Sequence, residues 1–490
     1  MKHLNKIILV ALAATTFSCN DDFEHPIEDI QVSAGEADFS KYIALGNSLT
    51  SGYRDNALYS SGQENSYPNI LAGLMKAAGG GEFKTPLMPN NTGGFSDASF
   101  GGTFPGKLEL QIVNGSLSPV PTAPGAALDN ITAGGPYQNM GVPGAKSYHL
   151  GVDGYGNPAR LSIGAANPYF VRFATSGTTS IVKDAVAQKP TFFSLWIGNN
   201  DVLGYATGGG VGKDHNETGN VSAEAYASGD ISNVTVVKNS IDGILTAMTA
   251  NGAKGVIANI PSVTSIPYFT TVPALPITGL TAEQVAALSS AQAYGAYNAG
   301  LGQARAINRI SEEEYQARLI KFTAGNVANG AVIQDKDLTD LSALGLPSYR
   351  QTTSKDLIVL TAASLLRQGF GTQTPLTDQY VLTEKETAKA EAAVTKFNTA
   401  ISELATKHNL AFVDAFSEMK KLSSASGIKY YGQTYTTTFI SGGAFSLDGV
   451  HLTGNGYAIV SNMFVDAINR KYKSTLRHVY PGNYPGIAIP

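Results

Sequence analysis

The chain contains the stretch Tyr42-Ile43-Ala44-Leu45-Gly46-Asn47-Ser48-Leu49-Thr50-Ser51-Gly52, in which an apolar run stops at a glycine and a serine follows closely. A short apolar run closed by glycine is typical of a buried strand. Gly46 and Gly52 also let the backbone turn sharply at the sheet edge where α/β proteins place their sites. Ser48 is therefore a candidate nucleophile. Taken alone, the stretch favours a plainer interpretation, a serine in the turn after a strand.

A second stretch, Ser446-Leu447-Asp448-Gly449-Val450-His451-Leu452-Thr453, reverses that preference because it supplies an acid and a histidine. Acyl transfer by a serine requires a base for its proton, a carboxylate that holds the base, and donors for the oxyanion. Five histidines have plainer explanations: His3 in the N-terminal leader, His25 in the polar segment after it, His215 in a glycine-rich loop, His408 at a predicted helix end and His478 in a basic tail. His149 and His451 remain, and His451 alone has an acid three residues before it.

The composition describes a globular chain with no sign of a nucleic-acid partner. Of its 490 residues, 43% are hydrophobic and 15% are charged, which is enough apolar material for a large core. The formal net charge is -4, and no run of Lys and Arg with interleaved aromatic residues offers a surface for phosphates. We therefore expect no nucleic acid among the partners.

Strand and helix patterns alternate along most of the chain. Apolar runs predict further strands at 191–197, 254–261 and 410–414, and helical spacing predicts helices at 67–78, 236–250, 383–407 and around Val460, Phe464, Ala467 and Ile468. Thr383 and Glu386 form a capping box at the start of the third helix. This alternation predicts an α/β fold: a mainly parallel sheet between two layers of helices.

Three long segments interrupt the alternation. Residues 86–137 are rich in Gly, Pro, Asn and Ser and contain one expected hairpin, 108–113, turning at Asn114-Gly115. Residues 203–232 are rich in glycine, and residues from about 265 to 380 hold helical patches at 281–307 and 312–321. We interpret the last segment as an insertion or cap within one domain at 39–480, followed by a tail at 481–490.

The N-terminus carries a targeting signal. Basic Lys2 and Lys6 precede a short apolar core at 7–14, and the single cysteine, Cys19, follows where cleavage is expected. Residues 1–19 resemble a bacterial lipoprotein signal peptide with an acylated Cys19, which implies a lipid anchor in a membrane; the alternative is a secretory peptide with an incidental cysteine. Residues 20–38 read as a flexible tether, and their acidic start resembles the surface-export tract of Bacteroidetes lipoproteins. We expect an extracytoplasmic, outer-membrane lipoprotein, and the acidic tract implies exposure at the cell surface.

Five sequence blocks together resemble the SGNH hydrolase superfamily, the GDSL-type esterases and lipases. They are Gly46-Asn47-Ser48-Leu49, with Asn47 where the family has Asp, then 139–147, Gly198-Asn199-Asn200-Asp201, Asn259-Ile260-Pro261 and Asp448-Gly449-Val450-His451. The resemblance implies a three-layer α/β/α, flavodoxin-like fold with Ser48 as nucleophile, His451 as base and Asp448 as the acid that orients it. It also implies an oxyanion hole formed by the Ser48 and Gly144 N–H groups and the Asn200 amide.

The implied activity is a serine esterase that forms an acyl-enzyme and needs no cofactor. The Gly-x-Ser-x-Gly signature of α/β-hydrolases is missing, Leu108 replaces the Ser or Thr of a phosphate loop at 101–107, and no His-Glu-x-x-His metal motif occurs. The substrate could be a lipid, a short-chain acyl ester or an acetylated carbohydrate, and neither this choice nor the oligomeric state can be read from the sequence. A catalytically silent glycan- or lipid-binding lipoprotein is the alternative, but such a binder would not need the catalytic blocks.

Overall fold

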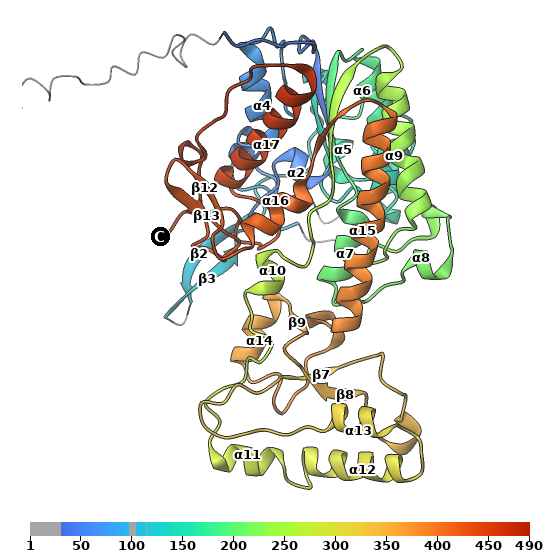
Figure 1. Cartoon of the computed structure of the whole chain (residues 1–490), viewed down its shortest axis with the longest axis vertical. Coiled ribbons are helices and arrows are strands. Elements are labelled where there is room, and N and C mark those ends of the chain that lie inside the picture. Colours follow the sequence, from blue (N-terminus) through green and yellow to red (C-terminus); the bar gives the residue numbers. More distant parts are fainter. Residues whose placement is uncertain (1–30, 98–103, 114) are drawn as a thin grey trace, which may run out of the picture.

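Five parallel strands form the central sheet of the computed structural model, which describes residues 31–97, 104–113 and 115–490 (Figure 1). The strands are β1 (Tyr42–Gly46), β4 (Asn139–Gly141), β5 (Phe192–Trp196), β6 (Lys254–Ala258) and β11 (Ala411–Val413), in the order β11-β6-β5-β1-β4. Every neighbouring pair is parallel. The predicted parallel sheet is therefore confirmed.

The central strands are buried along their whole length, which explains their apolar sequences. All five residues of β1 and all five of β5 are buried, as expected for parallel strands with both faces covered. The edge strand β4 falls in the segment 139–147, where the apolar patterns predict no strand. Its three residues are too few for a periodic pattern, and pairing with β1 (Ala44 opposite Asn139) makes them a strand.

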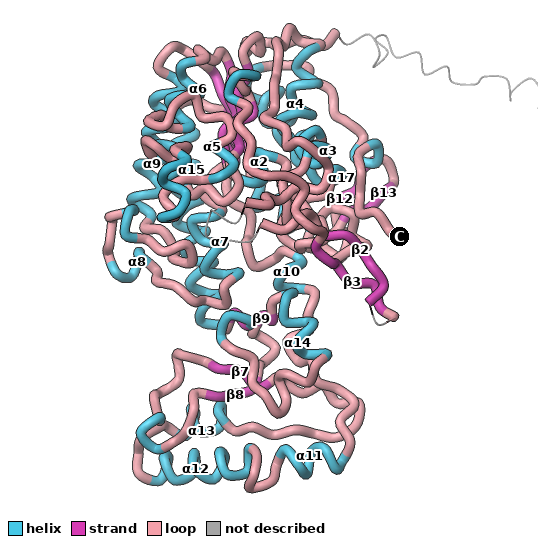
Figure 2. The backbone as a smooth tube through the Cα atoms, turned by 180° about the vertical axis from the view of Figure 1, so that it is seen from behind, coloured by secondary structure: helices cyan, strands magenta, loops and turns pink. Residues whose placement is uncertain are grey.

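Helices cover both faces of the sheet. Figures 1 and 2 show α4 (Tyr67–Lys76) and α17 (Gly454–Tyr472) on one side and α6 (Ile181–Ala187), α9 (Val234–Thr249) and α15 (Glu384–Lys407) on the other. The capping box of α15 is confirmed, because the side chains of Thr383 and Glu386 each accept the other's backbone N–H. The fold is thus the predicted three-layer α/β/α sandwich.

The strand order identifies where a ligand site is expected. The chain passes from β1 to β4 on one side and then crosses to β5 on the other side of β1. Counted along the chain, the sheet order is the flavodoxin-like 2-1-3-4-5, whose crevice opens at the carboxyl ends of the first and third strands. Ser48 follows β1 and Asn199 follows β5, so both residues lie at this switch point.

Shorter elements decorate the main body. The hairpin expected at 108–113 is present, with β2 (Leu108–Val113) antiparallel to β3 (Ser116–Pro121); Asn114 of its turn lies outside the described residues. A second hairpin joins β12 (Ile428–Tyr430) and β13 (Gln433–Tyr435). The remaining short helices of the body are α2 (Ser48–Ser51), α3 (Ser60–Glu64), α5 (Pro168–Val171), α7 (Asn200–Thr207), α8 (His215–Thr218) and α16 (Ala415–Leu422).

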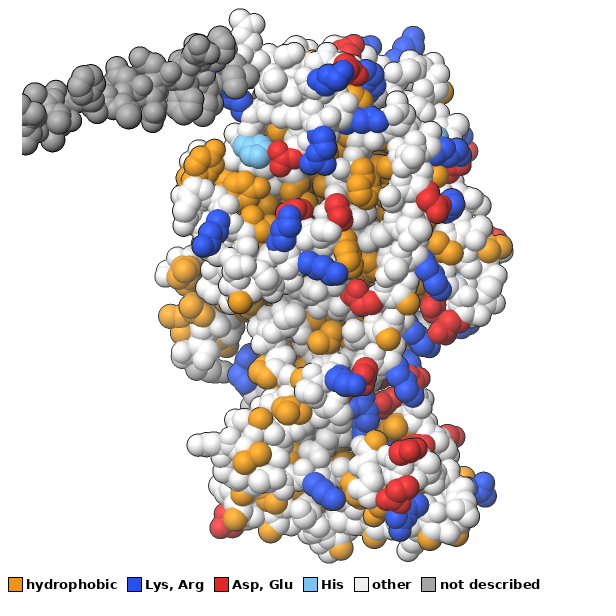
Figure 3. Space-filling view, viewed as in Figure 1, with side chains coloured by type: hydrophobic (Ala, Val, Ile, Leu, Met, Phe, Trp, Pro, Cys, Tyr) orange, Lys and Arg blue, Asp and Glu red, His pale blue; other side chains and the backbone are white. Residues whose placement is uncertain are grey.

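The insertion forms a lobe that projects from the body, and the molecular outline narrows between the two (Figures 1 and 3). Its elements are α10 (Pro267–Thr270), α11 (Ala282–Leu288), α12 (Tyr294–Ala306), α13 (Glu312–Arg318), β7 (Val332–Gln334), β8 (Tyr349–Gln351), β9 (Leu357–Ile358) and α14 (Ala363–Arg367), and β9 pairs with β10 (Val381–Leu382).

Two expectations for this insertion need correction. The helical patch at 281–307 is two helices, because the chain leaves the helical path at Ser289 and resumes it at Tyr294. The patch at 312–321 ends at Arg318 because Leu319 is not helical. Of the insertion at 265–380, only Ile266 lines the pocket beside Ser48.

Both chain ends pack on the body where the structure describes them. Residues 31–38, part of the expected flexible tether, are held by contacts such as Glu36 N–H to Tyr472 O (2.6 Å) and the ion pair of Glu36 with Lys473 (2.6 Å). In the tail, the carbonyl of Gly486 accepts a bond from Arg54 Nη2 (3.1 Å). The expected signal peptide, Cys19 and residues 20–30 lie outside the described residues. No helix in the described ranges is long and apolar enough to cross a bilayer.

Candidate active site

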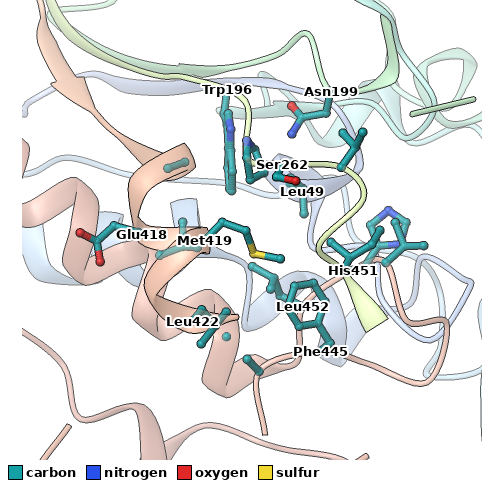
Figure 4. Close-up of a pocket in the computed structure, with 18 of the residues that line it drawn as sticks. Leu49, Trp196, Asn199, Ser262, Glu418, Met419, Leu422, Phe445, His451 and Leu452 are labelled. Atoms are coloured by element: carbon teal, nitrogen blue, oxygen red, sulfur yellow. The ribbon is translucent and has the colours of Figure 1, made fainter. Parts of the chain in front are cut away.

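One pocket at the switch point brings together residues that are far apart in sequence. Ser48 at the end of β1, Asn200 at the end of β5, and His451 all line it. Figure 4 shows His451 with other side chains of this pocket. The pocket has a volume of about 100 Å³. The structure therefore joins three of the predicted site residues on one surface.

The turn that presents Ser48 depends on the residues beside it. A side chain at Gly46 would put its Cβ 2.4 Å from the carbonyl oxygen of Trp196, so only glycine fits at this strand end. Asn47 caps helix α2, because its Oδ1 accepts the backbone N–H of Leu49 at 3.1 Å. Asn and Asp are equally good helix caps, so Asn47 serves this structural purpose where the GDSL pattern has Asp.

The Ser48 hydroxyl makes no hydrogen bond to any residue that the structure describes. His451 lines the same pocket without a direct bond to it. Catalytic hydrogen bonds are often long in the absence of substrate and tighten when substrate binds. Among the described residues, the fully buried side-chain oxygens without a partner are those of Ser232, Thr387 and Tyr435. The Ser48 hydroxyl is not one of them, so it is not fully buried and a ligand can reach it.

His451 is held by Asp448, as the resemblance implies. Its Nδ1 lies 2.9 Å from Asp448 Oδ2, and Asp448 Oδ1 accepts the backbone N–H groups of Val450 and His451, both at 2.8 Å. Burial acts to raise the pKa of Asp448, but the charge and hydrogen bonds of His451 outweigh it and hold the pKa well below its usual range. Asp448 is therefore ionised at neutral pH and fixes the orientation of the imidazole.

The segment after α2 supports this pair, and the sequence patterns did not identify it. The ring of Tyr53 lies 4.7 Å from that of His451. The Asn56 N–H donates to Asp448 Oδ2 at 2.9 Å, and buried Asp55 accepts the Leu447 N–H at 3.0 Å. Asp55 and Asn56 both have left-handed backbone angles, with φ of +52° and +60°, a strained conformation that tends to occur at functional sites.

Two of the three candidate oxyanion donors, Ser48 and Asn200, line the pocket. Among the described residues, the backbone N–H groups of Ser48 and Gly144 have no hydrogen-bond acceptor, so both are available. One N–H of the Asn200 amide donates to the Ala145 carbonyl at 2.9 Å, which positions the amide and leaves its second N–H for a ligand. Gly144 itself is exposed with φ of +79° and does not line the pocket wall.

Buried Asp201 joins the Gly144 segment to helix α7. Its Oδ2 accepts the Ser147 N–H at 2.7 Å and its Oδ1 accepts the Ser147 hydroxyl at 3.0 Å. Burial raises the pKa of Asp201, and these hydrogen bonds partly offset that effect. The last residue of the Gly-x-Asn-Asp block therefore supports the loop that carries Gly144.

Pairing with an acid does not by itself distinguish His451. His215, His408 and His478 also pair with aspartates, at 2.8 Å to Asp230, 2.7 Å to Asp242 and 2.7 Å to Asp466. None of these three lines the pocket beside Ser48. His149, the other candidate base, accepts the Lys146 N–H at its Nδ1 (3.0 Å), and burial lowers its pKa to about 4.

This buried histidine predicts a pH dependence of stability. Because the pKa of His149 falls from 6.5 to about 4 on folding, the unfolded chain binds this proton first as the pH drops. Stability that is complete above pH 6.5 is therefore lost progressively down to about pH 4, by about 3 kcal/mol. We expect His149→Gln, which keeps an acceptor for Lys146, to lose less stability than the wild type between neutral pH and pH 4 in urea unfolding.

The control for this experiment is His478→Gln. The hydrogen bond that His478 donates to Asp466 raises the pKa of His478. The contribution of His478 to stability is therefore present at low pH and is lost as the pH rises through the folded value. The two variants should therefore change the pH dependence of unfolding in opposite directions. An acid dependence in His149→Gln equal to that of the wild type would contradict the assignment.

The solved structures similar to this chain are described as lipases and esterases, in agreement with the sequence resemblance, but the similarity is slight. No family model matches the chain, and no curated protein matches it. Among solved structures it is similar to a GDSL-like lipase from Parabacteroides merdae, with 12% identity and a TM-score of 0.32 over 89% of this chain and 99% of that one. It is also similar to an acetylxylan esterase from Geobacillus stearothermophilus, with 10% identity and a TM-score of 0.32 over 90% and 100% of the two chains.

A lipase/acylhydrolase from Enterococcus faecalis matches as well, at 10% identity and a TM-score of 0.30 over 90% of this chain and 99% of that one. Likenesses this slight transfer no activity to the present chain. Its function is therefore inferred from the residues of the pocket. In the described part of the chain, no group of three or more His, Cys, Asp or Glu side chains could hold a metal ion.

Proposed function

We propose that this protein is a serine esterase of the SGNH type that hydrolyses carboxylic esters through an acyl-enzyme. One observation carries the proposal: Ser48, at the switch point of the sheet, shares a pocket with His451, whose Nδ1 is held 2.9 Å from Asp448. A nucleophile, a base and an orienting acid are the parts that acyl transfer needs.

In the first step His451 Nε2 takes the proton of Ser48 Oγ as that oxygen attacks the ester carbonyl carbon. The resulting oxyanion is held by the Ser48 and Gly144 N–H groups and the Asn200 amide. Collapse breaks the bond to the alcohol oxygen, which receives the proton from His451 and leaves. Water then attacks the acyl-enzyme, His451 accepts its proton and returns it to Ser48, and the carboxylic acid departs.

The oxyanion assignment predicts a large effect for Asn200→Ala. Removing one such donor typically lowers kcat by about 10²–10³-fold, and the lost bond to Ala145 should cost stability by about 1 kcal/mol. Asn469→Ala is the control with unchanged kcat. Asn469 lies on α17, and its side-chain amide donates a comparable bond to the Leu476 carbonyl. Steady-state kinetics that give Asn200→Ala the wild-type kcat would exclude this role.

The activity itself can be tested with p-nitrophenyl esters of graded chain length and with a fluorophosphonate probe. We expect turnover of at least one ester and covalent labelling of the peptide that contains Ser48, detected by mass spectrometry. A folded protein that cleaves no ester and is not labelled would favour a binding protein on the same fold.

We further propose that the protein is an extracytoplasmic lipoprotein acylated at Cys19. Mass spectrometry of the mature N-terminus would test this.

A further inference from the structure

The pocket beside Ser48 has two kinds of wall. Apart from Glu418, its polar side chains are those of Asn47, Ser48, Asn199, Asn200, Ser262 and His451, which follow the ends of neighbouring strands or belong to the Asp448 loop. The rest of the lining is hydrocarbon, and α16 and α17 contribute a part of it. The pocket therefore combines a few polar side chains with a larger apolar surface.

The apolar wall is built from matching helix faces. Ala415, Met419 and Leu422 share one face of α16, and Ile459, Val460 and Met463 lie on α17. Residues spaced by three or four lie on the same side of a helix and normally pack against another element. These side chains belong to the buried core or pack against it, and they also border the pocket.

Glu418 does not break this apolar character. Figure 4 shows Glu418 and Leu422 on the side of the pocket away from His451, with Met419 reaching toward the centre and the Glu418 carboxylate turned away from it. This carboxylate pairs with Lys421 at 2.5 Å and is 32% exposed. Its charge is therefore neutralised at the rim.

We propose that this wall binds the hydrocarbon chain of a fatty acyl group, so that the ester cleaved is one of a medium- or long-chain fatty acid, octanoyl or longer. An acetyl group would reach only the corner beside Ser48 and would leave the α16 and α17 side chains without a contact. A sugar ring would find no hydrogen-bond partners on that wall. Each methylene moved from water to such a surface can raise affinity by about fourfold.

This substrate class rests on the proposed esterase function, but binding of the chain can be measured without turnover. Titration calorimetry of the Ser48→Ala protein with dodecanoate, octanoate and butanoate is the direct test. We expect dodecanoate to bind at least about a hundredfold tighter than butanoate, in line with the gain per methylene. Equal affinities, or no binding of dodecanoate, would overturn the proposal.

Variants that fill the pocket test where the fatty acyl chain binds. Met463→Trp, at a half-buried position of the wall, should weaken dodecanoate binding at least tenfold and leave butanoate binding unchanged. If that variant does not fold, Ile428→Trp on β12 occupies the same pocket from another element. Ile307→Trp, 60% exposed in the distant lobe, is the matched control. Wild-type binding of dodecanoate by the pocket variants would contradict the assignment.

The rates of the wild-type protein separate this inference from the proposed function. We expect kcat/KM to rise from the acetyl to the octanoyl p-nitrophenyl ester by at least about a hundredfold. Tight dodecanoate binding without cleavage of any ester would contradict the esterase function and support the acyl-chain site. If the acetyl ester is cleaved best and dodecanoate does not bind, the acyl-chain site is contradicted and the esterase function is supported.

Discussion

Replacing Ser48 with alanine is expected to lower kcat for ester hydrolysis by about 10⁴–10⁶-fold, the range seen when a serine hydrolase loses its nucleophile. Folding should hardly change, because the Ser48 hydroxyl has no hydrogen-bond partner among the described residues and a substitution of this kind costs less than about 0.5 kcal/mol. The measurement is kcat on the preferred p-nitrophenyl ester together with the free energy of unfolding in urea.

Ser51→Ala is the matched control for this experiment. Ser51 lies on the same short helix, is buried, and donates its hydroxyl to the Ser48 carbonyl at 2.9 Å. Its loss should cost about 1 kcal/mol of stability while kcat stays within about tenfold of the wild type, since a positioning bond of this kind takes no part in proton transfer. Wild-type activity in Ser48→Ala would remove the nucleophile assignment, whatever Ser51→Ala does.

Asp448→Asn should lower kcat by about 10⁴-fold, the effect of the same change in a well-studied catalytic triad. The amide presents an N–H toward His451 Nδ1, 2.9 Å from the present carboxylate oxygen. The imidazole then carries its proton on Nε2 and cannot accept one from Ser48. The same amide also faces the Asn56 N–H, which now donates to Asp448 Oδ2, so a loss of stability accompanies the loss of activity.

The pH dependence of unfolding gives this variant a second readout. Because the pKa of Asp448 is lower in the folded protein, its contribution to stability is present above the unfolded value of about 4 and is lost as the pH falls through the folded value. Asp448→Asn should lack that acid-dependent loss.

The control for Asp448→Asn is Asp466→Asn. Asp466 pairs with His478 at 2.7 Å on the exposed side of α17, so its change should leave kcat unchanged and cost less than about 1 kcal/mol. An Asp448→Asn enzyme with the wild-type kcat would show that His451 does not depend on this acid.

Local sequence patterns predicted the framework of the fold. The apolar run ending at Gly46 is β1, the Thr383 and Glu386 capping box starts α15, and Val460, Phe464, Ala467 and Ile468 are buried on α17. These features can be predicted from the sequence because burial of both faces of a strand, or of one face of a helix, produces a pattern of apolar residues at regular spacing. The pairing of Asp448 with His451 could be predicted because the two residues are close in sequence.

Other features depend on partners that are distant in the chain. The strand β4 exists because 139–141 pair with β1, and three histidines pair with aspartates that no spacing rule connects to them. The support of Asp448 by the Asn56 N–H joins residues that are 392 positions apart.

The sequence by itself thus determined the class of fold and the residue types available for catalysis. Only the tertiary structure decided which histidine shares a pocket with Ser48, and that α16 and α17 give this pocket an apolar wall. The physical reason is that periodicity records only whether a residue is buried. The identity of the neighbour that buries it is set by the packing of segments hundreds of residues apart.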